Sequence, residues 1–368
     1  MPTNDWMNEF SHRADLTLSD ITFPASHDAG LSKAPDCYYP INQTLAPVAT
    51  FVRNAITPTQ RYKSAKQDTI CQQGDIRFQL DSGSRAFDVR CALRLGVPRT
   101  IHAEGGAAGK AGGGYGQTVE SIATQIREFL VANPSEIVIL RISHTSVEVA
   151  DRVRVILNLE LPTAYRFLSD ERNLAAVPLN QLRGKCLIIF HADALPETRP
   201  RIGFHRFARY DPQANEHHGL HFCGDYAGFF GKTVDIAMTA FRAGNAHAAP
   251  AHGATAHRHL FMVYWQEAFD VEHKTVEGGN ISRGRRVNAG VKPPEQRLHI
   301  DLYQGVHYNL PFLLNVHRGT TNAMVRGVRS NCTHGNRRAF QPNWINLDFI
   351  NPTVCERVIA FNREMLGL

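Results

Sequence analysis

The sequence predicts a single α/β domain built as a parallel barrel of alternating strands and helices. Short apolar runs recur along the chain with helical or loop material between them, which is typical of parallel strands joined by crossover connections. The chain has 368 residues, of which 43% are hydrophobic. This length accommodates a (β/α)8 barrel of ~250 residues with about a hundred residues left for insertions.

The strand-like runs are short, rich in β-branched and aromatic residues, and bounded by turn-forming residues. They lie at residues 21–23, 85–89, 100–102, 137–142, 186–190, 260–265 and 344–349. We expect one more strand between Phe204 and Phe222, which would complete the set that such a barrel requires.

Two helices are predicted with clear boundaries. In residues 118–132 the apolar side chains recur at the spacing of one helical face, and Asn133-Pro134 stops the pattern. The closing segment, residues 352–368, is also predicted to be a helix. The chain therefore ends with a strand followed by a helix.

The remaining long stretches are polar, charged or glycine-rich, and we expect them to be insertions into one domain that spans residues 1–368. They are residues 31–80, 105–116, 195–219 and 270–294. The glycine-rich stretch GGAAGKAGGGYG lacks the strand, Lys-Ser/Thr and helix context of a P-loop. We interpret it as a mobile lid beside the site.

Composition restricts the partners. Forty Lys and Arg against 34 Asp and Glu give a formal charge of +6, which favours anionic partners such as acidic lipids but is too thinly spread for a nucleic-acid-binding arm. No apolar run approaches the ~20 residues needed to span a bilayer. The seven cysteines show no C-x-x-C spacing, which argues against a structural zinc site.

The stretch with the clearest chemical content is ITFPASHDAG, residues 21–30, where His27 and Asp28 follow an apolar run. Because Pro24 has no N–H for a sheet ladder, we expect the strand to stop there. An imidazole beside a carboxylate can act in general acid–base catalysis at neutral pH. For this stretch taken alone, a solvated pair in a loop is the alternative.

Three other residues make the functional interpretation stronger. Arg90, His102 and Asp348 lie, like His27, at or near the ends of predicted strands. In parallel barrels the reacting groups sit at the carboxyl ends of the strands. We therefore expect these side chains to converge on one site.

Several segments resemble, in order, the successive blocks of the bacterial phosphatidylinositol-specific phospholipases C. They are PASHDAG, GSRAFDVR, TIH, NPSEIVILRIS and NWINLDFI. The resemblance covers both ends of the chain and most of its first half, and it is thin between about residues 195 and 342. It implies an irregular TIM-type barrel that cleaves phosphatidylinositol to diacylglycerol and inositol 1,2-cyclic phosphate.

The resemblance also implies roles for single residues. His27 matches the general base that takes the proton from the inositol 2-hydroxyl, and Asp348 matches the carboxylate that orients it. His102 matches the general acid that protonates the departing diacylglycerol oxygen, with Asp28 as its partner. Two histidines with pKa values near ~6.5 suit this division of labour at neutral pH.

Arg90 matches the arginine that clamps the phosphate, and Asp88 a supporting carboxylate. Relatives that need a divalent cation carry a Glu-x-Asp pair on this strand, whereas this chain has Asp88-Val89-Arg90. A guanidinium in the place of the cation would repel a metal ion. We therefore expect a reaction that uses no metal and no cofactor.

Headgroup contacts are predicted at five further positions. Asp225 and Tyr226 resemble an inositol-binding aspartate and its neighbour, with a turn aspartate as the alternative. Tyr264 and Trp265 end a predicted strand and would either wall the inositol ring or pack in the core. Arg141 is a candidate for the cation that relatives place elsewhere near the headgroup.

The resemblance implies a monomeric enzyme that docks peripherally on phosphatidylinositol membranes or vesicles and binds no nucleic acid. We expect it to be secreted after loss of a signal peptide that is not present in this chain. Two alternatives stay open. One is the same chemistry on another inositol phosphodiester, such as a glycosyl-phosphatidylinositol anchor or glycerophosphoinositol; the other is a catalytically inactive barrel that binds inositol headgroups.

Overall fold

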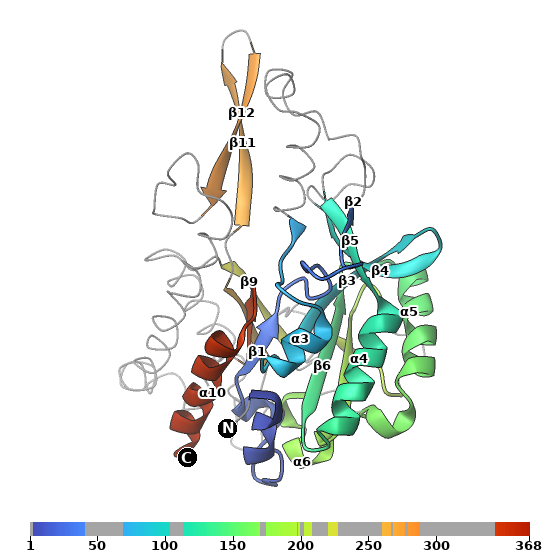
Figure 1. The fold of residues 1–368 in the computed structure, drawn as a ribbon, viewed down its shortest axis with the longest axis vertical. Helices are drawn as coiled ribbons and strands as arrows, with labels where there is room; N and C mark the ends of the chain where they lie inside the picture. Colours follow the sequence, from blue (N-terminus) through green and yellow to red (C-terminus); the bar gives the residue numbers. More distant parts are fainter. Residues whose placement is uncertain are drawn as a thin grey trace.

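A computed structural model describes most of the two ends of the chain and part of its middle (Figure 1). The described residues are 3–40, 69–103, 113–169, 174–196, 198, 202–207, 220–226, 260–265, 268–276, 279–287 and 343–368, and from 220 to 287 the description is of the backbone. Within them, no helix is long and apolar enough to cross a membrane.

Among the described residues, the main sheet has eleven strands, most of which form one parallel row. In spatial order the row is β9 (Leu220–Tyr226), β10 (Leu260–Trp265), β13 (Trp344–Leu347), β1 (Phe23–Ser26), β3 (Ala86–Arg94), β6 (Ile137–Ser143), β7 (Lys185–His191) and β8 (His205–Phe207). This confirms the predicted α/β class. Between β8 and β9, the two ends of the row, the described residues include no ladder.

The predicted strand at residues 100–102 lies outside this row. β4 (Val97–Ala103) pairs antiparallel with the far end of β3, and β5 (Gly113–Thr118) and β2 (Tyr39–Pro40) continue the antiparallel extension. The row is complete without β4 because the stretch in which we expected one strand holds two, β8 and β9. His102 therefore lies on a hairpin that extends beyond the row.

The expectation that Pro24 ends its strand is wrong, because β1 continues to Ser26. The carbonyl of Pro24 accepts the N–H of Arg85 at 3.0 Å and the hydroxyl of Ser84 at 3.2 Å. These partners precede the first paired residue of β3. A proline is tolerated at the beginning of a strand, where its missing N–H removes no ladder bond.

Each of the four predicted insertions contains strand residues among those described, with β2 in the stretch 31–80 and β8 in the stretch 195–219. The last residues of the stretch 105–116 belong to β5, and residues 270–294 overlap an antiparallel pair of strands, β11 (Ala268–Val276) and β12 (Gly279–Val287). Charged residues occur along both β11 and β12. A pair of strands without an apolar face lacks the alternation by which strands are recognised.

Both predicted helices are confirmed. α4 (Val119–Ala132) begins after Thr118, whose hydroxyl accepts the N–H of Ser121 at 3.1 Å. α10 (Pro352–Leu366) ends at Gly367, which has a φ of 71°. The other helices are α3 (Ile76–Asp81), α5 (Val147–Glu160), α6 (Leu179–Leu182) and the 3-10 helices η1 (Thr3–Glu9), η2 (Leu18–Asp20), η3 (Thr163–Tyr165) and η4 (Leu174–Ala176).

The period of two along β6 divides the core between the two faces of the row. Ile137 and Ile139 pack with residues of β1, β7 and β13, whereas Val138 and Leu140 pack against α4 and α5. In Figure 1 these two helices lie side by side along the sheet. Arg141 therefore continues the inner face of β6 toward its carboxyl end.

A buried ion pair joins the amino end of β3 to the loop before β6. Arg85 contacts Glu136 through Nε, and both side chains are fully buried. Arg85 also donates to the carbonyl of Leu80 at 2.8 Å and lies over the Phe129 ring, while Glu136 accepts the N–H of Met7 at 2.8 Å. These contacts hold the amino-terminal segment and α4 to the base of the sheet.

Replacing Arg85 by Met should lower the free energy of unfolding by about 3–5 kcal/mol, because the Glu136 carboxylate would stay buried without its counter-charge. The matched control is Arg77→Met, which removes an exposed pair with Asp81 and should cost about 0.5 kcal/mol or less. Urea unfolding followed by circular dichroism measures both. Equal midpoints for the two variants would contradict the role given to Arg85.

Candidate active site

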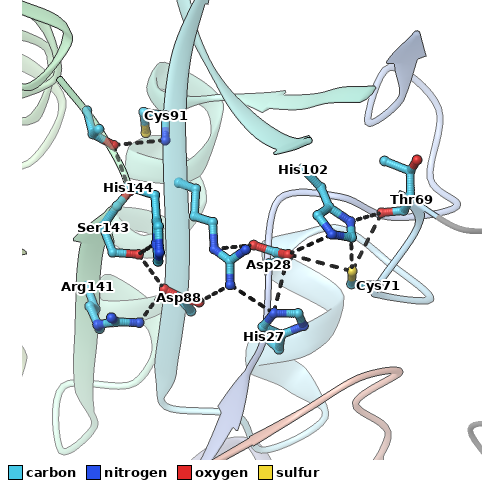
Figure 2. Close-up of polar contacts among 12 residues, drawn as sticks. His27, Asp28, Thr69, Cys71, Asp88, Cys91, His102, Arg141, Ser143 and His144 are labelled. Atoms are coloured by element: carbon cyan, nitrogen blue, oxygen red, sulfur yellow. Dashed lines mark hydrogen bonds and ion pairs between the residues drawn. The ribbon is translucent and has the colours of Figure 1, made fainter. Parts of the chain in front are cut away.

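Seven of the predicted residues, namely His27, Asp28, Asp88, Arg90, His102, Arg141 and Asp348, lie together near the carboxyl ends of β1, β3, β6 and β13. Figure 2 shows His27, Asp28, Asp88, His102 and Arg141 among them. His27 and Asp28 directly follow β1, and Asp348 directly follows β13. Arg90 lies on the same face of β3 as Asp88, two residues along. The side chains of His27 and Asp28 are almost fully buried, whereas that of Arg90 is 20% exposed. Part of the Arg90 side chain is therefore open to a ligand.

His27 is held at both ring nitrogens. Nδ1 lies 2.9 Å from Asp348 Oδ1, and Arg90 Nη2 donates to Nε2 at 3.1 Å. The tautomer with its hydrogen on Nδ1 satisfies both contacts, because Nδ1 then donates and Nε2 accepts. In this form the lone pair of Nε2 is available to a proton donor that displaces Arg90.

Electrostatics favour proton uptake at His27. Burial lowers the pKa of an imidazole, but the carboxylates of Asp28 and Asp348 outweigh burial and the opposing charge of Arg90, so the net shift of the His27 pKa is upward. A base with a raised pKa takes a proton more strongly. Its neutral form is lost as the pH falls through that raised pKa.

Asp28 contacts Arg90 and both histidines of the site. Its Oδ1 lies 2.9 Å from Arg90 Nε, and its Oδ2 lies 3.3 Å from His27 Nε2 and 3.7 Å from His102 Nε2. Burial raises the pKa of a carboxyl, yet Arg90 and the two histidines overcome this and hold the pKa of Asp28 below its ordinary value. Asp28 is thus a carboxylate that both imidazoles share.

His102 approaches from β4 of the antiparallel extension, and not from the end of a strand of the parallel row as expected. Its Nδ1 lies 3.2 Å from the carbonyl of Thr69, and its ring centroid is 6.4 Å from that of His27. The side chain is 22% exposed. Its Nε2, on the Asp28 side, can carry a proton toward a bound ligand.

Asp88 links Arg90 to two residues of β6, Arg141 and Ser143. Its Oδ1 accepts from Arg141 Nη1 at 2.6 Å and from the Ser143 hydroxyl at 3.0 Å, and its Oδ2 lies 3.5 Å from Arg90 Nη2. Burial raises the pKa of Asp88, but Arg141 and Arg90 lower it far more. Arg141, expected to contact a headgroup, is 3% exposed and directed at Asp88.

Sequence reasoning missed three residues of this site. Gln72 donates to the carbonyls of His27 at 2.7 Å and Leu347 at 3.0 Å, so it ties together the ends of β1 and β13. Cys71 and His144 lie beside Asp28 and Ser143 respectively. Gln72 and Cys71 fall in a polar stretch interpreted as an insertion, and no local pattern marks them.

The remaining predicted residues lie at the ends of β9 and β10. Asp225 is paired with Tyr264 and Tyr226 with Trp265, so the four positions are neighbours at the carboxyl ends of two adjacent strands. Their side chains lie outside the part of the structure that is described. The contacts expected of these four residues with a headgroup therefore stay predictions.

Fold and site together define a barrel-type α/β protein with two carboxylate-linked histidines and an arginine at the carboxyl ends of its strands. No family model matches the chain, and no curated protein matches it in sequence. Solved structures do. The phosphatidylinositol-specific phospholipase C of Listeria monocytogenes aligns with a TM-score of 0.53 and 14% identity, over 98% of this chain and 99% of that chain.

Phosphatidylinositol-specific phospholipase C of Staphylococcus aureus aligns comparably. A double mutant gives a TM-score of 0.55 at 13% identity, and another structure of this enzyme gives 0.51 at 12%. Both alignments cover 98% of this chain and 97% of the other. The chain therefore has the fold of the bacterial phosphatidylinositol-specific phospholipases C, as the sequence predicts.

Asp348→Asn should lower the pKa of His27, because it removes one of the carboxylates that raise it. NMR titration of the His27 imidazole measures the shift directly, with no substrate present. The matched control is Asp15→Asn, which removes an exposed carboxylate paired with Arg13 and should leave the His27 pKa where it was. An unchanged pKa in the Asp348 variant would contradict this account of the pair.

Proposed function

We propose that this chain is a phosphodiesterase that cleaves phosphatidylinositol to diacylglycerol and inositol 1,2-cyclic phosphate. The observation that carries the proposal is the convergence of two imidazoles, 6.4 Å apart between ring centroids, on one guanidinium and one shared carboxylate. Phosphoryl transfer to a hydroxyl of the same substrate needs one proton removed, one delivered and a fixed positive charge. The likeness to phospholipases C of known fold supports the choice of substrate.

The proposed reaction assigns the first proton transfer to His27. The phosphate enters against Arg90, whose Nη2 leaves His27 Nε2 and donates to a phosphoryl oxygen. The lone pair of His27 Nε2, now free of Arg90, accepts the proton of the inositol 2-hydroxyl. At the same time the oxygen of that hydroxyl attacks phosphorus. Asp348, at 2.9 Å from Nδ1, stabilises the imidazolium that forms.

His102 completes the reaction as general acid. It delivers a proton from Nε2 to the diacylglycerol oxygen as the bond from that oxygen to phosphorus breaks. Asp28, within 3.7 Å of this nitrogen, stabilises the charged imidazole before transfer. Since the nucleophile is part of the substrate, little entropy is lost in bringing the reacting atoms together.

Arg90 takes the part that a divalent cation plays in related enzymes. Its guanidinium lies between the carboxylates of Asp28 and Asp88, at 2.9 and 3.5 Å, where calcium or magnesium would otherwise find oxygen ligands. A planar donor fork can bind two phosphoryl oxygens and stays protonated. We therefore propose a reaction that is independent of these metals.

The proposed contacts with the inositol headgroup involve residues at the ends of β9 and β10. Asp225, Tyr226, Tyr264 and Trp265 occupy the same end of the sheet as the histidines, where the inositol ring would lie. Arg141 would act through Asp88 and Arg90, because its guanidinium contacts Asp88. The enzyme would work as a secreted monomer at a membrane surface that contains phosphatidylinositol.

The test is to incubate the chelator-treated protein with phosphatidylinositol vesicles and follow the phosphorus NMR signal of the cyclic product. His27→Ala and His102→Ala should each lower the rate by about 10² to 10⁴. The control is His12→Ala, since His12 is exposed and contacts only a nearby carbonyl among the bonds described. Turnover that needs added calcium would overturn the role of Arg90.

Other outcomes separate the alternatives. Cleavage of soluble glycerophosphoinositol but not of vesicles would indicate the same chemistry on another inositol phosphodiester. Intact lipid after long incubation, together with vesicle binding, would indicate a headgroup-binding barrel without catalysis.

Arg90→Lys should lower turnover by about 10² to 10³, because an ammonium is a compact point charge without the planar donor fork that binds two phosphoryl oxygens. The matched control is Arg94→Lys on the same strand, whose guanidinium lies over the Tyr39 ring. Initial rates on vesicles measure both variants. Near-normal turnover of the Arg90 variant would mean that this arginine does not bind the phosphate.

A further inference from the structure

A thiol faces the proposed acid–base machinery. Cys71 is buried, and its Sγ lies 3.7 Å from His102 Nδ1 and 3.9 Å from Asp28 Oδ2 (Figure 2). It donates to the carbonyl of Thr69 at 3.5 Å. None of the steps proposed above uses this sulfur.

The sulfur belongs to a group of metal-ligating atoms. One donor atom each from His27, Asp28 and Cys71 lie within 4.8 Å of one another, and all three residues are buried. In tetrahedral zinc sites the bonds are about 2.3 Å to sulfur and about 2.0–2.2 Å to nitrogen and oxygen, which puts neighbouring ligand atoms about 3.3–3.7 Å apart. The separations here, 3.3 Å from Asp28 to His27 and 3.9 Å from Asp28 to Cys71, are close to that range.

His102 is placed to supply a fourth ligand to a metal ion bound by these three residues. The ring of His102 presents Nδ1 to Cys71 and Nε2 to Asp28, each at 3.7 Å. A rotation of this ring would direct one nitrogen into the space between the sulfur and the carboxylate. One sulfur, two imidazoles and one carboxylate form a set that suits zinc and similar ions.

We propose that Cys71, Asp28, His27 and His102 form a binding site for a thiophilic divalent cation, Zn²⁺ or Cd²⁺, and that the bound cation blocks catalysis. The block rests on the proposed function, whereas the site itself does not. The cation would take the Nε2 lone pair of His27 and a nitrogen of His102. Both proton transfers would then stop.

The charge around the proposed cation site and the kinds of ligand atom in it determine which cations it can bind. Arg90 contacts Oδ1 of Asp28, whereas the metal would use Oδ2, so one carboxylate can serve both. Binding displaces the Arg90 Nη2 contact from His27 and releases the thiol proton of Cys71 to solvent. Calcium and magnesium prefer several oxygen ligands, and Asp28 is the only oxygen donor in this set.

The first experiment measures binding alone. The chelator-treated protein is titrated with cadmium chloride in phosphate-free buffer, and the ultraviolet thiolate-to-cadmium charge-transfer band is followed. We expect one site whose affinity falls at least about 100-fold in Cys71→Ser, since loss of a ligand exceeds the 10–100-fold usual for outer-shell changes. Cys37→Ser is the control, because Cys37 is equally buried but lies outside the group.

A band of equal affinity in Cys71→Ser, or no band in the wild-type protein, would overturn the site. The second experiment adds zinc chloride to the vesicle assay.

We expect zinc to stop turnover of the wild-type protein and of Cys37→Ser, and chelator to restore it. The residual turnover of Cys71→Ser should be insensitive to zinc. Unchanged wild-type turnover with metal bound would overturn the block. Binding without any turnover, with or without metal, would refute the proposed function and leave the metal site standing.

Discussion

The ion pair between Asp28 and Arg90 is the contact on which the arrangement of the site depends. Through its two oxygens, the buried carboxylate contacts the guanidinium at 2.9 Å and both imidazoles within 3.7 Å. Burial raises the pKa of the Asp28 carboxyl, and Arg90 is the largest of the opposing charges that hold that pKa below its ordinary value, so without Arg90 this buried carboxylate would take up a proton more readily. With Arg90 in place, a site low in solvent can hold charged groups whose fields act on the histidines.

Backbone geometry at the strand ends holds these groups in position. Asp28, His144 and Phe349, which follow β1, β6 and β13 closely, have φ angles of 40°, 49° and 53°. Left-handed backbone is unfavourable for residues with a Cβ and persists where surrounding contacts impose it. Gln72 provides such contacts, since it bonds the carbonyls of His27 and Leu347 and accepts the N–H of Ile350 at 3.0 Å. Two of these left-handed residues, Asp28 and Phe349, directly follow His27 and Asp348 at the strand ends.

The close approach of groups to which we assign proton transfer is also the basis of the metal site that we propose. In the proposed reaction, the Arg90 guanidinium would exclude calcium and magnesium because it lies between the carboxylates of Asp28 and Asp88. An ion that binds through sulfur and imidazole would approach Oδ2 of Asp28, the oxygen that faces Cys71 and His102, and would displace Arg90 only from His27 (Figure 2). Burial raises the pKa of the Cys71 thiol well above its ordinary value, with the nearby carboxylates adding to it, so the metal-free sulfur is a neutral and unreactive neighbour.

By itself the sequence determined the α/β class and both bounded helices, because periodicity and residue type are local. It also predicted that His27, Arg90 and Asp348 lie together, because strand ends in a parallel sheet meet at one edge. It misplaced His102, since nothing local distinguishes a strand of the parallel row from one that folds back beyond it. It also missed Gln72 and Cys71. Among their partners, Asp28, His27, Leu347 and Ile350 lie 43 to 278 positions away in the chain, and contacts over such distances exist only once the fold has brought the segments together.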